Sequence, residues 1–177
     1  MEHMSVGDAR LELTVGDITL QETDAVVNAA NKRLAPGGGV AGAIHRAAGP
    51  ELWEECKELQ GCRTGEAKIT RGYHLPASYV IHTVGPVYSG RRRDAELLEA
   101  CYHNALQLAR EYALASISFP ALSTGAFGYP LEKAARVALP AVIGWLEDND
   151  GVELVRFVLY DREAHDVHLE VLQSLKR

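Results

Sequence analysis

Two loop segments far apart in the chain combine glycines with amide or hydroxyl side chains. The first begins at Asn28 and Asn31 and continues into the run 37–42, Gly-Gly-Gly-Val-Ala-Gly. The second is 123–128, Ser-Thr-Gly-Ala-Phe-Gly. Glycine lets a ligand approach the backbone closely, and the bare N–H groups at a helix N-terminus favour an anion. Both segments therefore indicate sites for phosphate or sugar groups.

The run 37–42 also fits G-x-G-x-x-G, the fingerprint of dinucleotide-binding folds. That fingerprint requires a tight turn directly after a strand. Here residues 31–36, which include Pro36, separate the glycines from the apolar run 25–30. The segment that follows reads as another helix rather than a strand ending in an acidic residue. We therefore interpret the glycines as an anion cradle and not as a nicotinamide or flavin site.

Four single residues near these loops allow both a binding and a structural interpretation. Asp17 could accept a hydrogen bond from the amino group of a base, but an aspartate there also caps a turn. Tyr160 ends the last strand, where its ring could lie on a base. Phe127 could pack on a sugar or belong to the core. His45, four residues after Ala41, is expected to be a packed, hydrogen-bonded histidine.

The cysteines and the remaining histidines predict no metal site. Cys56, Cys62 and Cys101 are an odd number without C-x-x-C spacing, and we expect reduced structural thiols. His165 and His168 are three residues apart on an expected helix, and we place them on its solvated face. No cofactor is implied by these residues.

Apolar runs that alternate in type predict about six strands and five helices. The expected strands are 10–15, 25–30, 67–71, 78–84, 116–122 and 153–160, and the expected helices are 40–48, 51–59, 94–112, 131–146 and 162–175. Pro140 is expected to bend or interrupt the fourth helix. The expected core face of the third helix consists of Leu97, Cys101, Ala105, Leu108 and Tyr112.

Such alternation is typical of an α/β fold, a largely parallel sheet with helices on both faces. Ligands of open α/β sheets bind beyond the carboxyl ends of the strands. The segments 16–19, 28–40, 123–127 and 160–161 all follow expected strands. Their common position is stronger support for one ligand site than any single segment.

Length and charge limit the remaining possibilities. The 177 residues, 47% of them hydrophobic and 24% charged, suit one domain, with a core from about 9 to 175 and a flexible segment 1–8. The net charge of −6 argues against a duplex nucleic-acid partner. The basic run 91–93 is expected to be a solvated loop. No apolar run suits a membrane span or a secretory signal, so we expect a cytoplasmic location. We also expect a monomer.

Together these segments resemble the macrodomain family, the ADP-ribose-binding α/β/α modules. The resemblance runs from about Leu11 to about Leu172. It rests on five ordered motifs, at 16–19, 27–31, 37–49, 81–86 and 123–130. It implies a three-layer α/β/α fold whose sheet is mixed but mostly parallel.

The resemblance also implies a role for each segment. Asp17 would bond the adenine amino group, and Tyr160 would stack on the ring. The glycine loop and the segment 123–127 would cradle the diphosphate, and Asn31 would bond the hydroxyls of the distal ribose. The residues implied to bind ADP-ribose are Asp17, Ile18, Asn28, Asn31, Gly38, Gly39, Val40, Ser123, Thr124, Gly125, Ala126, Phe127 and Tyr160.

Within the family, the segment 37–50 is similar to the MacroD-type branch. Those enzymes hydrolyse esters of ADP-ribose, namely mono-ADP-ribosyl groups on acidic side chains and O-acetyl-ADP-ribose. That branch has an aspartate directly after the valine, proposed to position the water, where this chain has Ala41. Viral and some archaeal macrodomains also read Gly-Gly-Gly-Val-Ala.

The resemblance therefore implies an ADP-ribosyl ester hydrolase in which the substrate's diphosphate assists the water. Its catalytic candidates are Asn31 and His45. Its implied partners are ADP-ribose, O-acetyl-ADP-ribose and mono-ADP-ribosylated proteins. The main alternative is a non-catalytic reader of ADP-ribose, which Ala41 favours. A module that binds RNA or poly(ADP-ribose) is a third class, and net acidity weighs against RNA.

Overall fold

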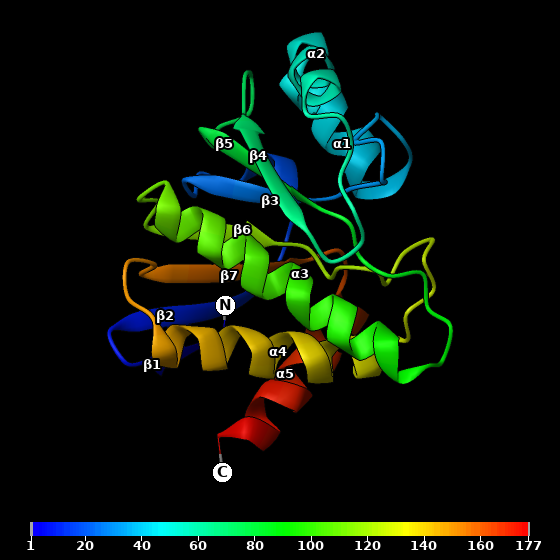
Figure 1. Ribbon diagram of the computed structural model, residues 1–177. Helices are drawn as coiled ribbons and strands as arrows, with labels where there is room; N and C mark the ends of the chain where they lie inside the picture. Colours follow the sequence, from blue (N-terminus) through cyan, green and yellow to red (C-terminus); the bar gives the residue numbers. More distant parts are fainter. Residues whose placement is uncertain (1, 177) are drawn as a thin grey trace.

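The computed structural model describes residues 2–176, which form a seven-stranded mixed sheet between two layers of helices (Figure 1). The strands are β1 (Glu2–Val6), β2 (Ala9–Val15), β3 (Ala25–Ala29), β4 (Ala67–Arg71), β5 (Tyr79–Thr83), β6 (Ser116–Phe119) and β7 (Leu154–Leu159). The helices are α1 (Gly39–Ala48), α2 (Pro50–Glu58), α3 (Arg92–Glu111), α4 (Leu131–Asp148) and α5 (Arg162–Leu175), with a 3₁₀ turn, η1, at Ile18–Leu20. The alternating strands and helices predicted from the sequence are confirmed.

The order of the strands brings the carboxyl ends of five parallel strands to the same end of the sheet. The order is β1-β2-β7-β6-β3-β5-β4, and β2, β7, β6, β3 and β5 are successive parallel neighbours. Antiparallel strands, β1 and β4, form the two outer edges. The loops that follow β3 and β6 consequently lie on the same side of the molecule, at the right of Figure 1.

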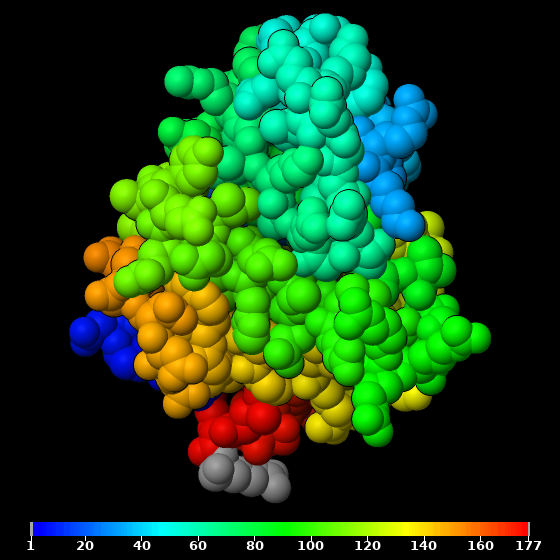
Figure 2. All heavy atoms as spheres, viewed as in Figure 1, coloured from blue at the N-terminus to red at the C-terminus, as the bar shows by residue number. Residues whose placement is uncertain are grey.

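The two faces of the sheet carry different layers. The larger core packs α3, α4 and α5 against one face and includes Phe119, Phe157 and Tyr102. A smaller core lies under α1 and α2 and includes Val26, Val80 and Val158 from the opposite face of the same strands. Figure 2 shows α3 and α4, in green and gold, covering one side, with the cyan α1–α2 segment above them.

Part of the second face is polar. The register pairs Glu12 of β2 with Arg156 of β7, and Arg156 with Ser118 of β6, so the three side chains share one face. Val26 of β3 continues this row and belongs to the smaller core. A row of polar residues thus runs from the edge of the smaller core across three strands.

The N-terminal segment differs from the expectation. We expected residues 1–8 to be flexible, but residues 2–6 form β1, which pairs with β2 in an antiparallel hairpin; Met1 lies outside the described residues. Gly7 has φ of +59°, as the first position of a type II′ hairpin turn requires. Backbone pairing holds this edge strand, and its side chains offer only Met4 and Val6 to the interior.

Two helix faces also differ from the expectation. On α3 the buried face contains Leu98, Cys101, Tyr102, Ala105, Leu106 and Ala109, whereas Tyr112 is 49% exposed. The Tyr102 ring lies 4.9 Å from the Phe119 ring, which turns the helix toward this face. On α5, His165 and His168 are buried and not solvated, because they lie on the stripe of Ala164, Val171 and Leu172.

Two further expectations concern Pro140 and the cysteines. Helix α4 continues through Pro140 rather than stopping there. Cys56, Cys62 and Cys101 are free and buried, as predicted. Burial raises the pKa of Cys56 to about 12, so this thiol stays protonated at neutral pH.

Within residues 2–176 no helix is both long and apolar enough to cross a membrane, and no group of ligating side chains could hold a metal ion.

Candidate functional site

A cleft of about 930 Å³ opens at the edge where β2, β7, β6 and β3 end. Its walls come from four segments: the turn after β2, the glycine loop with the start of α1, the loop after β6, and the junction of β7 with α5. The lining residues that the sequence predicted are Asp17, Ile18, Asn31, Gly38, Gly39, Val40, Ser123, Thr124, Gly125, Ala126, Phe127 and Tyr160. The structure therefore brings most of the predicted residues into one cavity.

The glycine loop presents the N-terminus of α1 to the cleft. Gly38 is the N-cap, no side chain caps this end, and the first turn holds no acidic residue. The first four N–H groups of an α-helix have no partner within the helix, and the helix dipole adds partial positive charge there. Ala41, also in this first turn, lines the cleft. This wall suits an anion.

Asn31 lines the cleft, but its side chain also holds the loop that it begins. Its Oδ1 accepts hydrogen bonds from the N–H groups of Arg33 (3.1 Å) and Ala35 (3.0 Å). Its Nδ2 donates to the carbonyl oxygen of Ala35 at 2.9 Å. The side chain is therefore fixed in orientation by its own loop before any ligand arrives.

The loop after β6 forms the opposite wall. Ser123 has φ of +68°, is 6% exposed, and its Oγ has no hydrogen-bond partner among the described residues. Thr124 Oγ1 donates to Ala121 O at 2.7 Å, and the Phe127 carbonyl accepts from Tyr88 N at 2.8 Å. These contacts fix the loop at both ends. Its small residues, Gly125 and Ala126, are exposed to solvent.

The turn after β2 and the end of β7 form the third part of the cleft. Oδ1 of Asp17 accepts from Thr19 N (2.9 Å) and Thr19 Oγ1 (2.6 Å), so Asp17 caps η1 as the structural interpretation expected. Its Oδ2 makes no hydrogen bond within the described residues. The Tyr160 ring is 91% exposed, and Asp161 caps α5 through Ala164 N at 2.9 Å. A carboxylate oxygen and an aromatic ring are thus both available in this part of the cleft.

Asn28 and His45 do not line the cleft. Asn28 is 1% exposed and contacts Nδ1 of His82 through its Nδ2 at 3.0 Å. His45 is 7% exposed, and neither ring nitrogen has a hydrogen-bond partner among the described residues, which differs from the expected hydrogen-bonded histidine. Burial lowers the pKa of His45. The structure therefore places Asn28 below the site and gives His45 no contact with it.

His82 anchors Asn28 and is expected to make stability depend on pH. Burial, and the neighbouring His45, lower the pKa of His82 from 6.5 to about 3, so the folded state keeps it neutral. Below pH 6.5 the unfolded chain binds this proton and the folded chain does not. Stability should therefore fall as pH drops from 6.5 toward 3, by about 1.4 kcal/mol per pH unit for this group.

Denaturant unfolding from pH 7 to pH 4 measures this slope. The variant His82→Gln removes the titrating group, and its stability curve should be flatter by that amount. Equal slopes in both proteins would contradict the assignment of the acid sensitivity to His82.

Two charged lining residues were missed by the sequence analysis. Arg46 lines the cleft from α1, and Glu163 lines it from α5. Arg46 takes part in no ion pair within residues 2–176. Helical spacing could have found it, because Val40, Ala43 and Arg46 are three residues apart and all line the cavity.

Comparison with known proteins identifies relatives over almost the whole chain. A family model described as Macro domain matches residues 27–138. A Macro domain-containing protein of Methanosarcina mazei is 53% identical over 162 residues, which cover 91% of this chain and 87% of the relative. ADP-ribose glycohydrolase MACROD1 of Bos taurus is 50% identical over 166 residues, 92% of this chain. This chain spans about half of that longer relative, 51% of its length.

Solved structures are similar in both fold and sequence. The Oceanobacillus iheyensis macrodomain, in a glycine-to-valine mutant with ADPR, has a TM-score of 0.96 and 44% identity, covering 99% of this chain and 98% of that chain. The Trypanosoma brucei macrodomain in complex with ADP-ribose has a TM-score of 0.87 and 44% identity, covering 92% and 68%.

Proposed function

This chain belongs to the macrodomain family, and we propose that its cleft binds ADP-ribose and hydrolyses ADP-ribosyl esters. Its 50% identity to MACROD1 supports the MacroD-like branch of the family. Two solved relatives carry ADP-ribose, and MACROD1 is named a glycohydrolase. The names of these relatives support ADP-ribose as the ligand and hydrolysis as the class of reaction. The geometry of the cleft supports the orientation in which ADP-ribose would bind.

The observation that carries the proposal is the pair of N–H-rich loops facing one cavity. The start of α1 and the loop 123–127 both line it, and both suit an anion. A diphosphate between them would place the adenine by Tyr160 and Asp17. The distal ribose would then lie by Asn31, with Phe127 over it. The 930 Å³ volume suits a ligand of this size.

The proposed reaction adds one water across the ester bond. The acyl group leaves as a carboxylic acid, and ADP-ribose keeps the freed hydroxyl. Ala41 supplies no base where the MacroD-type branch has its aspartate, so the substrate's own diphosphate orients the water and takes up its proton. That proton then passes to the departing ribose oxygen, which becomes the freed hydroxyl. Asn31, held rigidly by its loop, fixes the ribose, and backbone N–H groups stabilise the developing charge. The proposed targets are mono-ADP-ribosylated acidic side chains and O-acetyl-ADP-ribose.

Ala41 also supports a second function, a reader that binds ADP-ribose without turnover. Loss of a general base costs about 10²–10⁴ in rate. A cleft that retains every binding wall and lacks this group would hold the ligand and release it unchanged. The two functions share the site and differ only in chemistry.

Calorimetry and a turnover assay on the same preparation separate these functions. Binding of ADP-ribose together with release of acetate from O-acetyl-ADP-ribose, or of ADP-ribose from a protein modified on acidic residues, is the expected result. Binding without either release identifies a reader. The variant Tyr160→Ala is a matched control, because the ring is exposed and its loss should weaken binding about tenfold without unfolding the chain. Wild-type protein that does not bind ADP-ribose would overturn both functions.

A further inference from the structure

We propose that Gln21 and Arg156 are positioning residues that fix the Asp17 turn and thereby set the selectivity of the cleft for adenine. The inference rests on the proposed function, because it assumes that Asp17 meets the base. Neither residue lines the cleft. Both act through the backbone of the turn.

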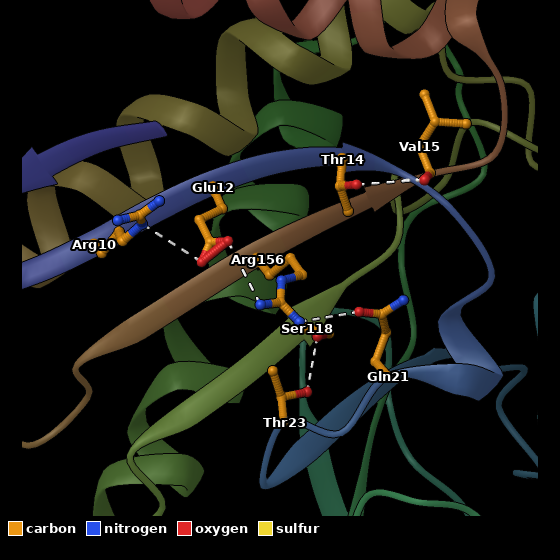
Figure 3. A network of polar contacts seen from close by, with 8 residues as sticks. All are labelled: Arg10, Glu12, Thr14, Val15, Gln21, Thr23, Ser118 and Arg156. Carbon is orange, nitrogen blue, oxygen red and sulfur yellow. Dashed lines mark hydrogen bonds and ion pairs between the residues drawn. The ribbon is translucent and has the colours of Figure 1, made fainter. Parts of the chain in front are cut away.

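Gln21 joins the turn to the sheet through both ends of its amide group. Its Nε2 donates to the carbonyl oxygen of Asp17 at 3.0 Å, and its Oε1 accepts from Nη1 of Arg156 at 3.1 Å. Figure 3 shows Gln21 facing the Arg156 guanidinium, which rises from β7. Since the amide has one donor end and one acceptor end, this pairing also fixes which way it is turned.

Arg156 is itself held in place by a buried carboxylate. Its Nη2 lies 3.5 Å from Oε2 of Glu12, a residue that is only 5% exposed. The other oxygen of Glu12 lies 3.6 Å from Nε of Arg10 (Figure 3). Removing the partner of a buried charge is strongly destabilising, so Glu12 restrains Arg156. The planar guanidinium fork lets Arg156 reach Glu12 and Gln21 at once, which a lysine ammonium could not do in the same geometry.

The segment that carries the turn is also fixed before and after it. Gly16 N donates to Leu159 O at 3.0 Å, which ties the start of the turn to the end of β7. Beyond Gln21, Thr23 Oγ1 lies 2.8 Å from Ser118 Oγ (Figure 3). Between these two anchors, the Gln21 side chain links the Asp17 backbone to Arg156 of β7.

Selectivity for adenine depends on where the Asp17 carboxylate lies. Adenine presents an amino donor at C6, and guanine presents a carbonyl acceptor at the same place. A carboxylate accepts from the first and repels the second, and hydrogen-bond energy falls steeply as the geometry worsens. If the turn were free to shift, the protein would therefore lose its preference for adenine before it lost its affinity for the diphosphate.

The experiment measures the affinities of ADP and GDP for the full chain by calorimetry. We expect wild-type protein to prefer ADP. Gln21→Met and Arg156→Met should each lower the ratio of ADP to GDP affinity about tenfold, the effect of one misplaced hydrogen bond. Arg10→Met is the matched control, because Arg10 also contacts Glu12 but forms no hydrogen bond to Gln21, and its ratio should equal that of wild type.

The ratio separates positioning from a structural role. Variants that merely lose stability would show a lower melting temperature and an unchanged ratio, which would overturn the inference. If the ratio of ADP to GDP affinity also falls in Arg10→Met, the effect comes from Glu12 and not from the contact between Gln21 and Arg156. That result would also overturn the inference. A wild-type chain that binds neither nucleotide nor ADP-ribose would refute the proposed function, and a wild type that binds ADP-ribose but shows no ADP preference would refute only the inference.

Discussion

Replacing Ala41 by aspartate is expected to raise the rate of ADP-ribosyl ester hydrolysis by about 10²-fold or more, because it supplies a general base. Ala41 lines the cleft in the first turn of α1. A carboxylate there is stabilised by the helix dipole, so the fold should tolerate it. It would lie where the diphosphate, the ribose and the attacking water are proposed to meet. Steady-state release of acetate from O-acetyl-ADP-ribose measures the effect.

Ala41→Asn is the matched control for this prediction. Asparagine has the size of aspartate but cannot take a proton from water at neutral pH, so hydrolysis should stay near the wild-type rate. Should Ala41→Asp leave the rate unchanged while ADP-ribose still binds, the water is positioned elsewhere in the cleft. Equal acceleration by both variants would point to packing and not to base catalysis.

Gly42→Ala should have the second large effect, a loss of ADP-ribose affinity of at least about 10²-fold. A Cβ at this position would overlap the carbonyl oxygen of Gly37, which is backbone and cannot rotate away. The glycine loop or the start of α1 must therefore move. Misplacement of a ligand-holding group by about 1 Å can cost 10²-fold. Overpacking should also lower the stability by about 1–3 kcal/mol.

Gly144→Ala is the control for the glycine substitution. Gly144 lies inside α4, and an added Cβ would meet nothing within 4 Å. This variant should bind ADP-ribose like wild type and gain about 0.5–1 kcal/mol of stability, because glycine is a poor helix residue. Calorimetry and thermal unfolding test both variants. Wild-type affinity in Gly42→Ala would show that the loop does not need its present position.

Most of the cleft could be predicted because its residues follow strands whose carboxyl ends must meet. Asp17, Asn31, Ser123 and Tyr160 each stand directly after, or within a few residues of, an apolar run, and the parallel order of the strands brings them together. The sequence shows this without any knowledge of side-chain direction. Predictions that needed side-chain direction were less reliable.

Asn28 and Arg46 illustrate what the linear pattern could not decide. Asn28 is only three residues from Asn31, but it lies within β3, where its side chain is directed to His82 beneath the cleft. Arg46 directly follows His45 on α1, but Arg46 lines the cleft and His45 is buried, because neighbouring residues of a helix face different sides. Such assignments depend on how a helix is turned against its sheet, which tertiary packing decides.

β1 and α5 show the same dependence on context. An edge strand of five residues is stabilised by backbone pairing with β2, so its side chains give little signal. His165 and His168 looked polar, but their positions on α5 face the sheet, and His168 satisfies Nδ1 by bonding Ala164 O at 2.8 Å. The polar character of the two histidines suggested exposure to solvent, whereas their position on the helix required burial.

The four walls of the cleft come from segments that span most of the chain, from Gly16 to Ala164. No single part of the chain therefore contains all four walls. Ligand binding is therefore coupled to the folding of the entire domain, and a ligand at 100 times its dissociation constant adds about 2.7 kcal/mol to the global unfolding free energy. Any mutation that destabilises one segment, even on the far side of the sheet, should therefore lower the affinity for the ligand. In this protein the ligand is a thermodynamic reporter of the whole fold.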